Sequence, residues 1–228
     1  MADRFGVSRV TANKALSQLV MEGLLQFRPG VGTFVRPEAL SLDLGTLVSF
    51  TQKAVKEGRT PSTEVLIFRR RGGGEAGPGV LSELGIEASE ALFEIRRVRK
   101  ADGIPVILEH RWLRAGLCPG LTEEDLAGSL YRRLRAEPDL VLTGADQRIE
   151  AVRLGPDEAR ALDTEPGAAA LRVHAVGLSN RGPVWVEDTL YRGDLFGIAN
   201  TIRMDGTPRP ARIASLSPSP KSVPQESP

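Results

Sequence analysis

The sequence predicts an α+β protein with two folded parts and an unstructured tail. Residues 1–36 show helical patterns followed by two short strand patterns, and residues 47–204 alternate long strand patterns with short helical ones. The long strand patterns meet in pairs across Ala101-Asp102-Gly103-Ile104 and Ser179-Asn180-Arg181-Gly182, which favours an antiparallel sheet built from hairpins. With 228 residues, the chain is long enough for two compact domains.

The first 22 residues predict two helices joined by a tight turn. Ala2 to Phe5 form the end of one helical pattern, Gly6 supplies the turn, and Ser8 is a good N-cap for a helix that runs to about Glu22. Five apolar residues recur at helical spacing and are expected to form one buried face: Ala12, Ala15, Leu16, Leu19 and Val20.

A hairpin is expected to follow once Gly23 closes this helix. Leu24 to Arg28 and Thr33 to Arg36 are the predicted strands, joined by a small tip over residues 29–32. Residues 1–36 carry five basic side chains against two acidic ones, a net charge of +3, whereas the whole chain is +1. Small, polar and basic groups on the exposed face of the second helix, with Lys14 among them, therefore indicate a nucleic-acid partner.

The run FGVSRVTANKALSQLVMEGLLQFRPGVGTFV resembles the winged helix-turn-helix domain of GntR-family bacterial transcription regulators. The resemblance implies double-stranded DNA as a partner, and Asn13 stands where many members have arginine. Members carry roughly 30 further residues before this point, including a helix that packs under the second helix. The sequence therefore predicts a truncated winged helix that leaves Leu16, Leu19 and Val20 exposed to water and binds DNA poorly. The DNA-binding candidates are Ser8, Arg9, Thr11, Asn13, Lys14, Arg28, Gly30, Gly32 and Thr33.

Four segments are expected: a partial DNA-binding domain over 1–36, a linker over 37–46, an effector-binding domain over 47–204 and a disordered tail over 205–228. A helix is predicted from about Ser49 to Glu57. Strands are predicted at Thr63 to Arg71, Ala91 to Ala101, Pro105 to Leu113, Val141 to Leu154, Ala169 to Leu178 and Val184 to Arg192. Helices at Gly79 to Leu84, Thr122 to Arg135 and Pro156 to Leu162 are expected to cover one face of the sheet.

Four separated motifs in the second part resemble the UTRA effector-binding domain of the HutC subgroup of GntR regulators. They are SFTQKAVKEGRTPSTEVL, EIRRVRKADGIPVILEHRWL, SLYRRL and LYRGDLF. The resemblance implies a fold related to chorismate lyase, with phosphate held by Ser49, Phe50, Thr51, Arg97, Arg99 and Ser129. It implies that Glu109, Tyr131 and Tyr191 face the rest of a phosphosugar ligand.

The residues themselves also favour an anion site, although Arg97 and Arg99 could instead form a solvated face or surface ion pairs. These two residues lie two apart on a strand and so point to the same face. A two-residue loop at Asp102-Gly103 would place Glu109 opposite Arg96, on the other face. We predict instead a register with one extra residue or a bulge at Pro105, which turns Glu109 towards the two arginines.

The identity of the ligand is left open between several anions. Amino-sugar-binding members carry an acid six residues before the tyrosine of YRGD, and this chain has Trp185 there, with Glu187 two residues later on the same strand face. Glu187 is therefore a further effector-binding candidate that could compensate. A different phosphosugar, a phosphonate or a carboxylate is an equal alternative.

Composition narrows the functional classes. The chain has one cysteine and two histidines, so no intramolecular disulfide, zinc-type cluster, metal or cofactor is predicted. No apolar run reaches 18 residues and no secretory leader is visible, so neither a membrane span nor a membrane partner is expected, and the protein is predicted to be cytoplasmic.

The predicted function is a ligand-responsive transcription regulator and not an enzyme. A homodimer would bind a palindromic operator, and a small anionic effector would release it by acting through the linker. Two alternatives stay open: a chorismate-lyase-like enzyme that uses Arg97, Arg99 and Glu109, and an effector-binding protein that no longer binds DNA.

Overall fold

The structure is a computed structural model that describes residues 2–22, 24–35, 40–43 and 49–199. The chain divides into two compact units, whose described residues lie within 2–35 and 40–199. The predictions for Gly23, Arg36, most of the linker and the tail over 205–228 fall outside the described residues.

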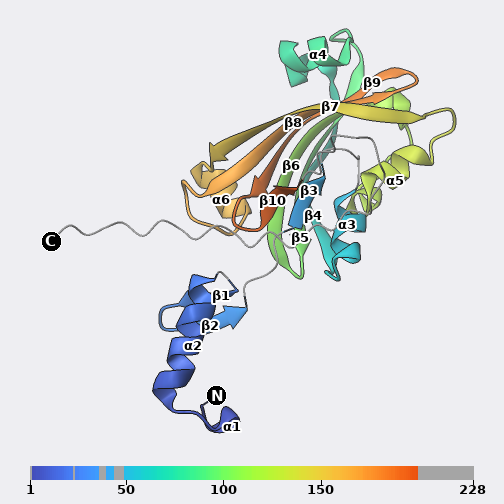
Figure 1. The fold of residues 1–228 in the computed structure, drawn as a ribbon. Coiled ribbons are helices and arrows are strands. Elements are labelled where there is room, and N and C mark those ends of the chain that lie inside the picture. The colour runs from blue at the N-terminus through green and yellow to red at the C-terminus, as the bar shows by residue number, and fades with distance from the viewer. Residues whose placement is uncertain (1, 23, 36–39, 44–48, 200–228) are drawn as a thin grey trace, which may run out of the picture. The chain divides into compact units, whose positions relative to one another are not determined.

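The first unit contains the predicted helices and hairpin (Figure 1). Helix α1 (Ala2–Phe5) ends at Gly6, whose φ of 62° is in the left-handed region that glycine tolerates. Helix α2 (Arg9–Met21) follows, and the hydroxyl of its N-cap residue Ser8 accepts a hydrogen bond from the backbone N–H of Thr11 at 3.1 Å. Strands β1 (Leu25–Arg28) and β2 (Gly32–Val35) pair antiparallel.

The apolar face of α2 is only partly covered by the described residues, in line with the expectation that Leu16, Leu19 and Val20 lack cover. Leu16, Leu19 and Val20 are half-buried, as is Ala12, and Ala15 is exposed. The described part of this unit offers two short helices and one hairpin, which together are too small to cover that face. The periodicity identified the apolar stripe correctly, but the described residues do not bury it.

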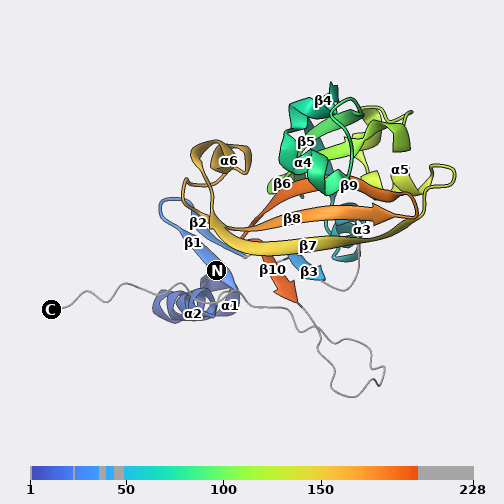
Figure 2. The same ribbon diagram turned by 90° about the horizontal axis from the view of Figure 1, so that it is seen from above.

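The second unit is built on a six-stranded sheet with the order β4-β5-β6-β9-β8-β7, and every neighbouring pair is antiparallel. Figure 2 shows the long strands side by side. Two-residue turns close the β5–β6 and β8–β9 hairpins, so both predicted hairpins are confirmed. The strands are β4 (Pro61–Gly72), β5 (Ala91–Ala101), β6 (Ile104–Arg114), β7 (Leu142–Arg153), β8 (Ala169–Ser179) and β9 (Gly182–Arg192).

Helices pack on both faces of this sheet, so the expectation that they cover one face is wrong. On one face, Leu134 of α5 (Leu130–Arg135) packs in a core with Ile95 and Trp185. On the other face, Leu84 of α4 (Pro78–Leu84) contacts a core that includes Leu92. Successive side chains of a strand point to opposite faces of the sheet, and several of these strands carry apolar residues on both faces. Both faces must therefore be packed against other elements.

The remaining helical elements are short. Helix α6 (Pro156–Ala161) packs Ala159 into a core with Leu108 and Leu190, on the same face as α4. Helix α3 (Phe50–Lys56) matches the predicted helix, and the predicted helix over Thr122 to Arg135 divides into η3 (Glu124–Ala127) and α5. Two further 3-10 turns are η1 (Gly73–Ala76) and η2 (Ala115–Leu117).

Two short strands were missed. Strand β3 (Leu40–Asp43) lies within the stretch predicted as linker, and it pairs parallel with β10 (Phe196–Ala199). Leu40 and Phe196 are buried in a core that also contains Val106. Each strand has four residues and its partner lies far away in the sequence, so local periodicity carries no signal for this pairing. No helix in the described part of the chain is long and apolar enough to cross a membrane.

Candidate anion-binding site

The central strands of the large sheet form a cavity with α3, Ser129 and the start of α5. It has a volume of about 60 Å³, enough for a few water molecules or a small anion. Its floor consists of alternate residues of β5, β6 and β9, which share one face of the sheet. The lining residues are Ser49, Phe50, Arg97, Arg99, Ile107, Glu109, Arg111, Ser129, Leu130, Tyr131, Glu187, Thr189 and Tyr191.

A bulge in the β5–β6 hairpin places Glu109 in this cavity. Lys100 pairs with Pro105, but Arg99 pairs with Ile107, so Val106 is the extra residue, and Arg97 then lies opposite Glu109. The loop has two residues and by itself would place Glu109 opposite Arg96. The bulge shifts the pairing by one residue. The predicted register is therefore confirmed.

Arg97 is held in the cavity wall by two buried partners. Its Nη2 donates to Glu109 Oε1 at 2.7 Å and its Nη1 donates to the carbonyl oxygen of Leu126 at 2.9 Å. The arginine is 1% exposed. Burial by itself would raise the pKa of Glu109, but the nearby guanidiniums of Arg97, Arg111 and Arg99 outweigh it and lower this pKa to about 2. Glu109 is consequently a carboxylate at neutral pH.

Arg111 forms a second buried ion pair that was not predicted. Its Nη2 donates to Glu187 Oε2, and its guanidinium lies over the rings of Tyr131 and Trp185 at 5.3 and 5.0 Å. Glu109 Oε1 lies 3.5 Å from Arg111 Nε. Burial by itself would lower the pKa of Arg111, but Glu187 and Glu109 raise it above its usual value.

Arg99 is the third buried arginine, and it forms no ion pair with a carboxylate among the described residues. Its Nη2 donates to Thr51 Oγ1 at 2.7 Å and its guanidinium lies 5.1 Å from the Phe50 ring centroid. Burial, together with the repulsion from Arg97, lowers the pKa of Arg99 to about 10. Burial raises the pKa of Glu187, whereas Arg111 opposes that rise. With all three arginines and both glutamates of the lining counted as ionised, the cavity has a formal net charge of +1.

Two serine hydroxyls complete the rim. Ser49 caps α3 by accepting from the backbone N–H of Gln52 at 3.2 Å, and Ser129 caps α5 by accepting from that of Arg132 at 3.3 Å. Each hydroxyl keeps a hydrogen with which to donate to a ligand oxygen.

The cavity brings together nine of the ten predicted effector residues. Thr51 is not among the lining residues, but its hydroxyl accepts a hydrogen bond from Arg99, which is one of them. Arg111, Thr189, Ile107 and Leu130 were missed. Arg111 could have been found from its place two residues after Glu109, and Thr189 from its place between Glu187 and Tyr191, because residues two apart share a strand face.

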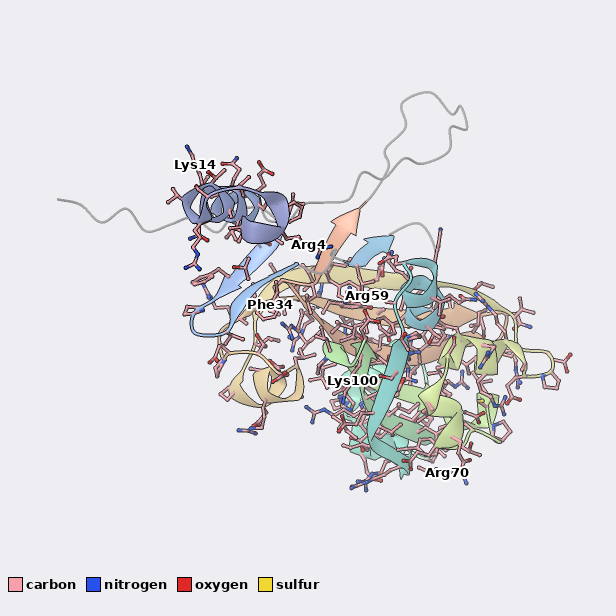
Figure 3. The ribbon with its side chains drawn as sticks, turned by 90° about the horizontal axis from the view of Figure 1, so that it is seen from below. Arg4, Lys14, Phe34, Arg59, Arg70 and Lys100 are labelled. Atoms are coloured by element: carbon pink, nitrogen blue, oxygen red, sulfur yellow. The ribbon has the colours of Figure 1, made fainter. Side chains whose placement is uncertain are left out.

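The DNA-binding candidates occupy two surfaces of the first unit. On α2 and its N-cap, Ser8, Arg9, Thr11, Asn13 and Lys14 are all exposed, and Figure 3 shows Lys14 pointing away from the helix. In the hairpin, Arg28 ends β1 and Thr33 is exposed in β2. Gly30 and Gly32 have φ values of 74° and 140°, which favour glycine.

A helix-turn-helix with a hairpin wing and a sheet domain with a cationic cavity occur together in this chain, a combination that is typical of ligand-responsive transcription regulators. Comparison with known families agrees: residues 1–35 match the gntR family of bacterial regulatory proteins, and residues 56–197 match the UTRA domain. The chain belongs to the GntR family of transcriptional regulators, in its HutC-like branch with a UTRA domain.

Individual relatives and solved structures support this assignment. The chain is 30% identical over 196 residues to the HTH-type transcriptional repressor NagR of Bacillus subtilis, covering 86% of this chain and 79% of NagR. It is 27% identical over 194 residues to the histidine utilization repressor of Pseudomonas putida, covering 85% and 76% of the two chains. The crystal structure of PhnF from Mycobacterium smegmatis has the same fold, with a TM-score of 0.68, 23% identity, and coverage of 90% of this chain and 89% of PhnF.

Proposed function

We propose that this protein is a DNA-binding repressor that a small anionic metabolite, such as a phosphosugar, releases from its operator. The observation that carries the proposal is Arg99, a buried cation without a carboxylate partner among the described residues, in a cavity with a net charge of +1. A bound anion would neutralise this charge and raise the pKa of Arg99 back towards its usual value. The hydroxyls of Ser49 and Ser129 would donate to the same anion.

The DNA-binding part of the proposal rests on the first unit. Arg9, Asn13 and Lys14 are exposed on α2, where a recognition helix contacts base edges and phosphates. Gly30, Gly32 and Thr33 belong to the proposed wing. A homodimer would place two such units on a palindromic operator, and the protein would act in the cytoplasm, where the DNA lies. The relatives named as repressors support repression over activation.

A role as an enzyme has less support. Acid–base chemistry by Glu109 would need a pKa near the working pH, whereas ion pairing lowers its pKa to about 2. The protonated acid is therefore scarce at neutral pH, and the carboxylate is occupied by Arg97. A metabolite bound in the cavity is expected to leave unchanged.

The proposal is tested by fluorescence anisotropy on an operator duplex selected from a random DNA library. The full chain is expected to bind the selected duplex and to be released by a phosphorylated sugar. If an anion binds but leaves the affinity for DNA unchanged, the proposal that an anion releases the repressor from its operator is contradicted. If the selection yields no duplex while anions still bind, the chain is an effector-binding protein that does not bind DNA.

A further inference from the structure

The cavity contains several buried hydrogen-bond donors that are unpaired among the described residues. Four buried guanidinium nitrogens have no hydrogen-bond partner among the described residues: Nε of Arg97, Nε of Arg99, and both Nε and Nη1 of Arg111, although Arg111 Nε lies 3.5 Å from Glu109 Oε1. These atoms belong to three residues that line one cavity. An unpaired buried donor is costly, so a ligand that supplies oxygen acceptors and allows small rotations of the guanidiniums would bind favourably.

Both carboxylates of the cavity are already in use. Glu109 accepts from Arg97, and Glu187 accepts from Arg111 and lies 3.5 Å from the hydroxyl of Thr189. A ligand ammonium group could reach either carboxylate only by displacing a guanidinium or by lying beside one. Arg97 is also tied to the Leu126 carbonyl, and Arg111 is stacked on two rings, so displacement costs further contacts.

The charge is unevenly distributed along the cavity. The Arg97–Glu109 and Arg111–Glu187 pairs are each neutral overall, and Arg99 carries the unmatched charge. One anionic group is therefore enough to balance the cavity. A second anionic group on the ligand would be repelled by the two carboxylates, with no unmatched cation left to offset that repulsion. A cationic group would be repelled by the three guanidiniums.

We propose that the cavity selects an effector with a single anionic group and an uncharged, oxygen-rich body, and that the Arg111–Glu187 pair excludes effectors that carry an amine. This inference rests on the proposed function of the cavity as an anion sensor. Specificity then comes partly from Arg111, whose guanidinium occupies the position in which a ligand amine would otherwise pair with Glu187.

The test uses pairs of phosphorus-containing anions that differ in one group, with inorganic phosphate as the reference. One pair is 2-hydroxyethylphosphonate and 2-aminoethylphosphonate, and the other is glucose 6-phosphate and glucosamine 6-phosphate. Calorimetric titration of the full chain at constant ionic strength gives each Kd. We expect the hydroxyl member to bind at least about ten-fold more tightly than the amine in a pair that binds.

Two variants assign this preference to the ion pair. Arg111→Gln leaves Glu187 unpaired and is expected to reduce or invert the preference for the hydroxyl member. Glu187→Gln leaves Arg111 unpaired and is expected to keep or increase the preference for the hydroxyl member. The ratio within a pair does not depend on how much either variant weakens folding. Arg160→Gln, an exposed arginine paired with Asp157, is the control and should leave the ratio unchanged.

Each outcome separates this inference from the proposed function. If phosphate binds but the amine members bind as tightly as the hydroxyl members, or if neither member of a pair binds, the inference is overturned and the anion site stands. The inference is also overturned if the ratio of the two Kd values within a pair is unchanged in Arg111→Gln, or if the preference for the hydroxyl member is reduced in Glu187→Gln. If no anion binds, inorganic phosphate included, the proposed function fails and the inference fails with it.

Discussion

At the scale of single residues, the three buried arginines have different tasks. Arg97 and Arg111 are each paired with a glutamate, whereas Arg99 donates to Thr51 and has no carboxylate partner among the described residues, so we assign the unmatched charge for a ligand to Arg99. The shared face of Arg97 and Arg99 could be predicted from the sequence, because residues two apart on a strand point to the same side. Their different pairing could not be predicted, because it depends on carboxylates that other strands contribute.

The first prediction concerns the Arg97–Glu109 pair. Glu109→Gln leaves Arg97 buried without its counter-charge and is expected to lower the free energy of unfolding by about 3–5 kcal/mol. Urea denaturation followed by circular dichroism measures the change. Glu64→Gln is the matched control, because Glu64 pairs with Lys100 at 2.7 Å on the surface and should change stability by less than about 0.5 kcal/mol. Equal stability of Glu109→Gln and the parent chain would show that the pair contributes nothing.

The second prediction is a pH dependence that follows from the same pair. The pKa of Glu109 is lowered from 4.5 to about 2 on folding, so its contribution is fully present above pH 4.5 and is lost as the pH falls towards 2. Between pH 5 and pH 2.5 the parent chain should lose about 2–2.5 kcal/mol more stability than Glu109→Gln does. Denaturant titrations at several pH values between 5 and 2.5 measure the difference. Parallel pH profiles would contradict the lowered pKa.

At the scale of elements, α3 and the β5–β6 hairpin position the site. The bulge at Val106 turns Glu109 onto the face of Arg97, and Phe50 and Thr51 of α3 hold the guanidinium of Arg99. The sequence predicted the hairpin, its bulge and the helix, because each has a local signature of turn residues, proline or capping serine. The pairing of β3 with β10 has no such signature and depends on tertiary contact.

The third prediction belongs to α3. Thr51→Val removes the hydrogen bond that orients Arg99 while keeping the volume of the side chain, and it is expected to raise the Kd for inorganic phosphate about ten-fold. Titration calorimetry measures the affinity. Gln52→Ala changes the next residue of the same helix, whose side chain is exposed, and should leave the Kd unchanged. A Kd for Thr51→Val equal to that of the parent chain would mean that Arg99 does not need this support.

At the scale of the whole molecule, the proposed function assigns DNA binding to the first unit and ligand sensing to the second. Family membership and the class of fold were recognisable from motifs in both units, and the comparisons confirm them. The spacing of the apolar residues predicted the α2 face, and the missing support predicted that this face lacks cover; the described residues leave it half-buried.

The fourth prediction is reciprocal coupling between the two units. If an anion lowers the affinity for operator DNA by some factor, DNA must lower the affinity for that anion by the same factor. Anion titrations with and without saturating operator duplex, and DNA titrations with and without saturating anion, give the two factors. Unequal factors would indicate a second anion site or a change of assembly state.

The most direct test of the anion cavity is the thermal unfolding midpoint as a function of inorganic phosphate at constant ionic strength. Parent chain and Arg96→Gln, which alters the neighbouring arginine on the opposite face of β5, should show the same saturable rise, about 5–10 °C at 100 times the Kd. Arg99→Gln should show no saturable rise. A rise in Arg99→Gln equal to that of the parent chain would contradict the account.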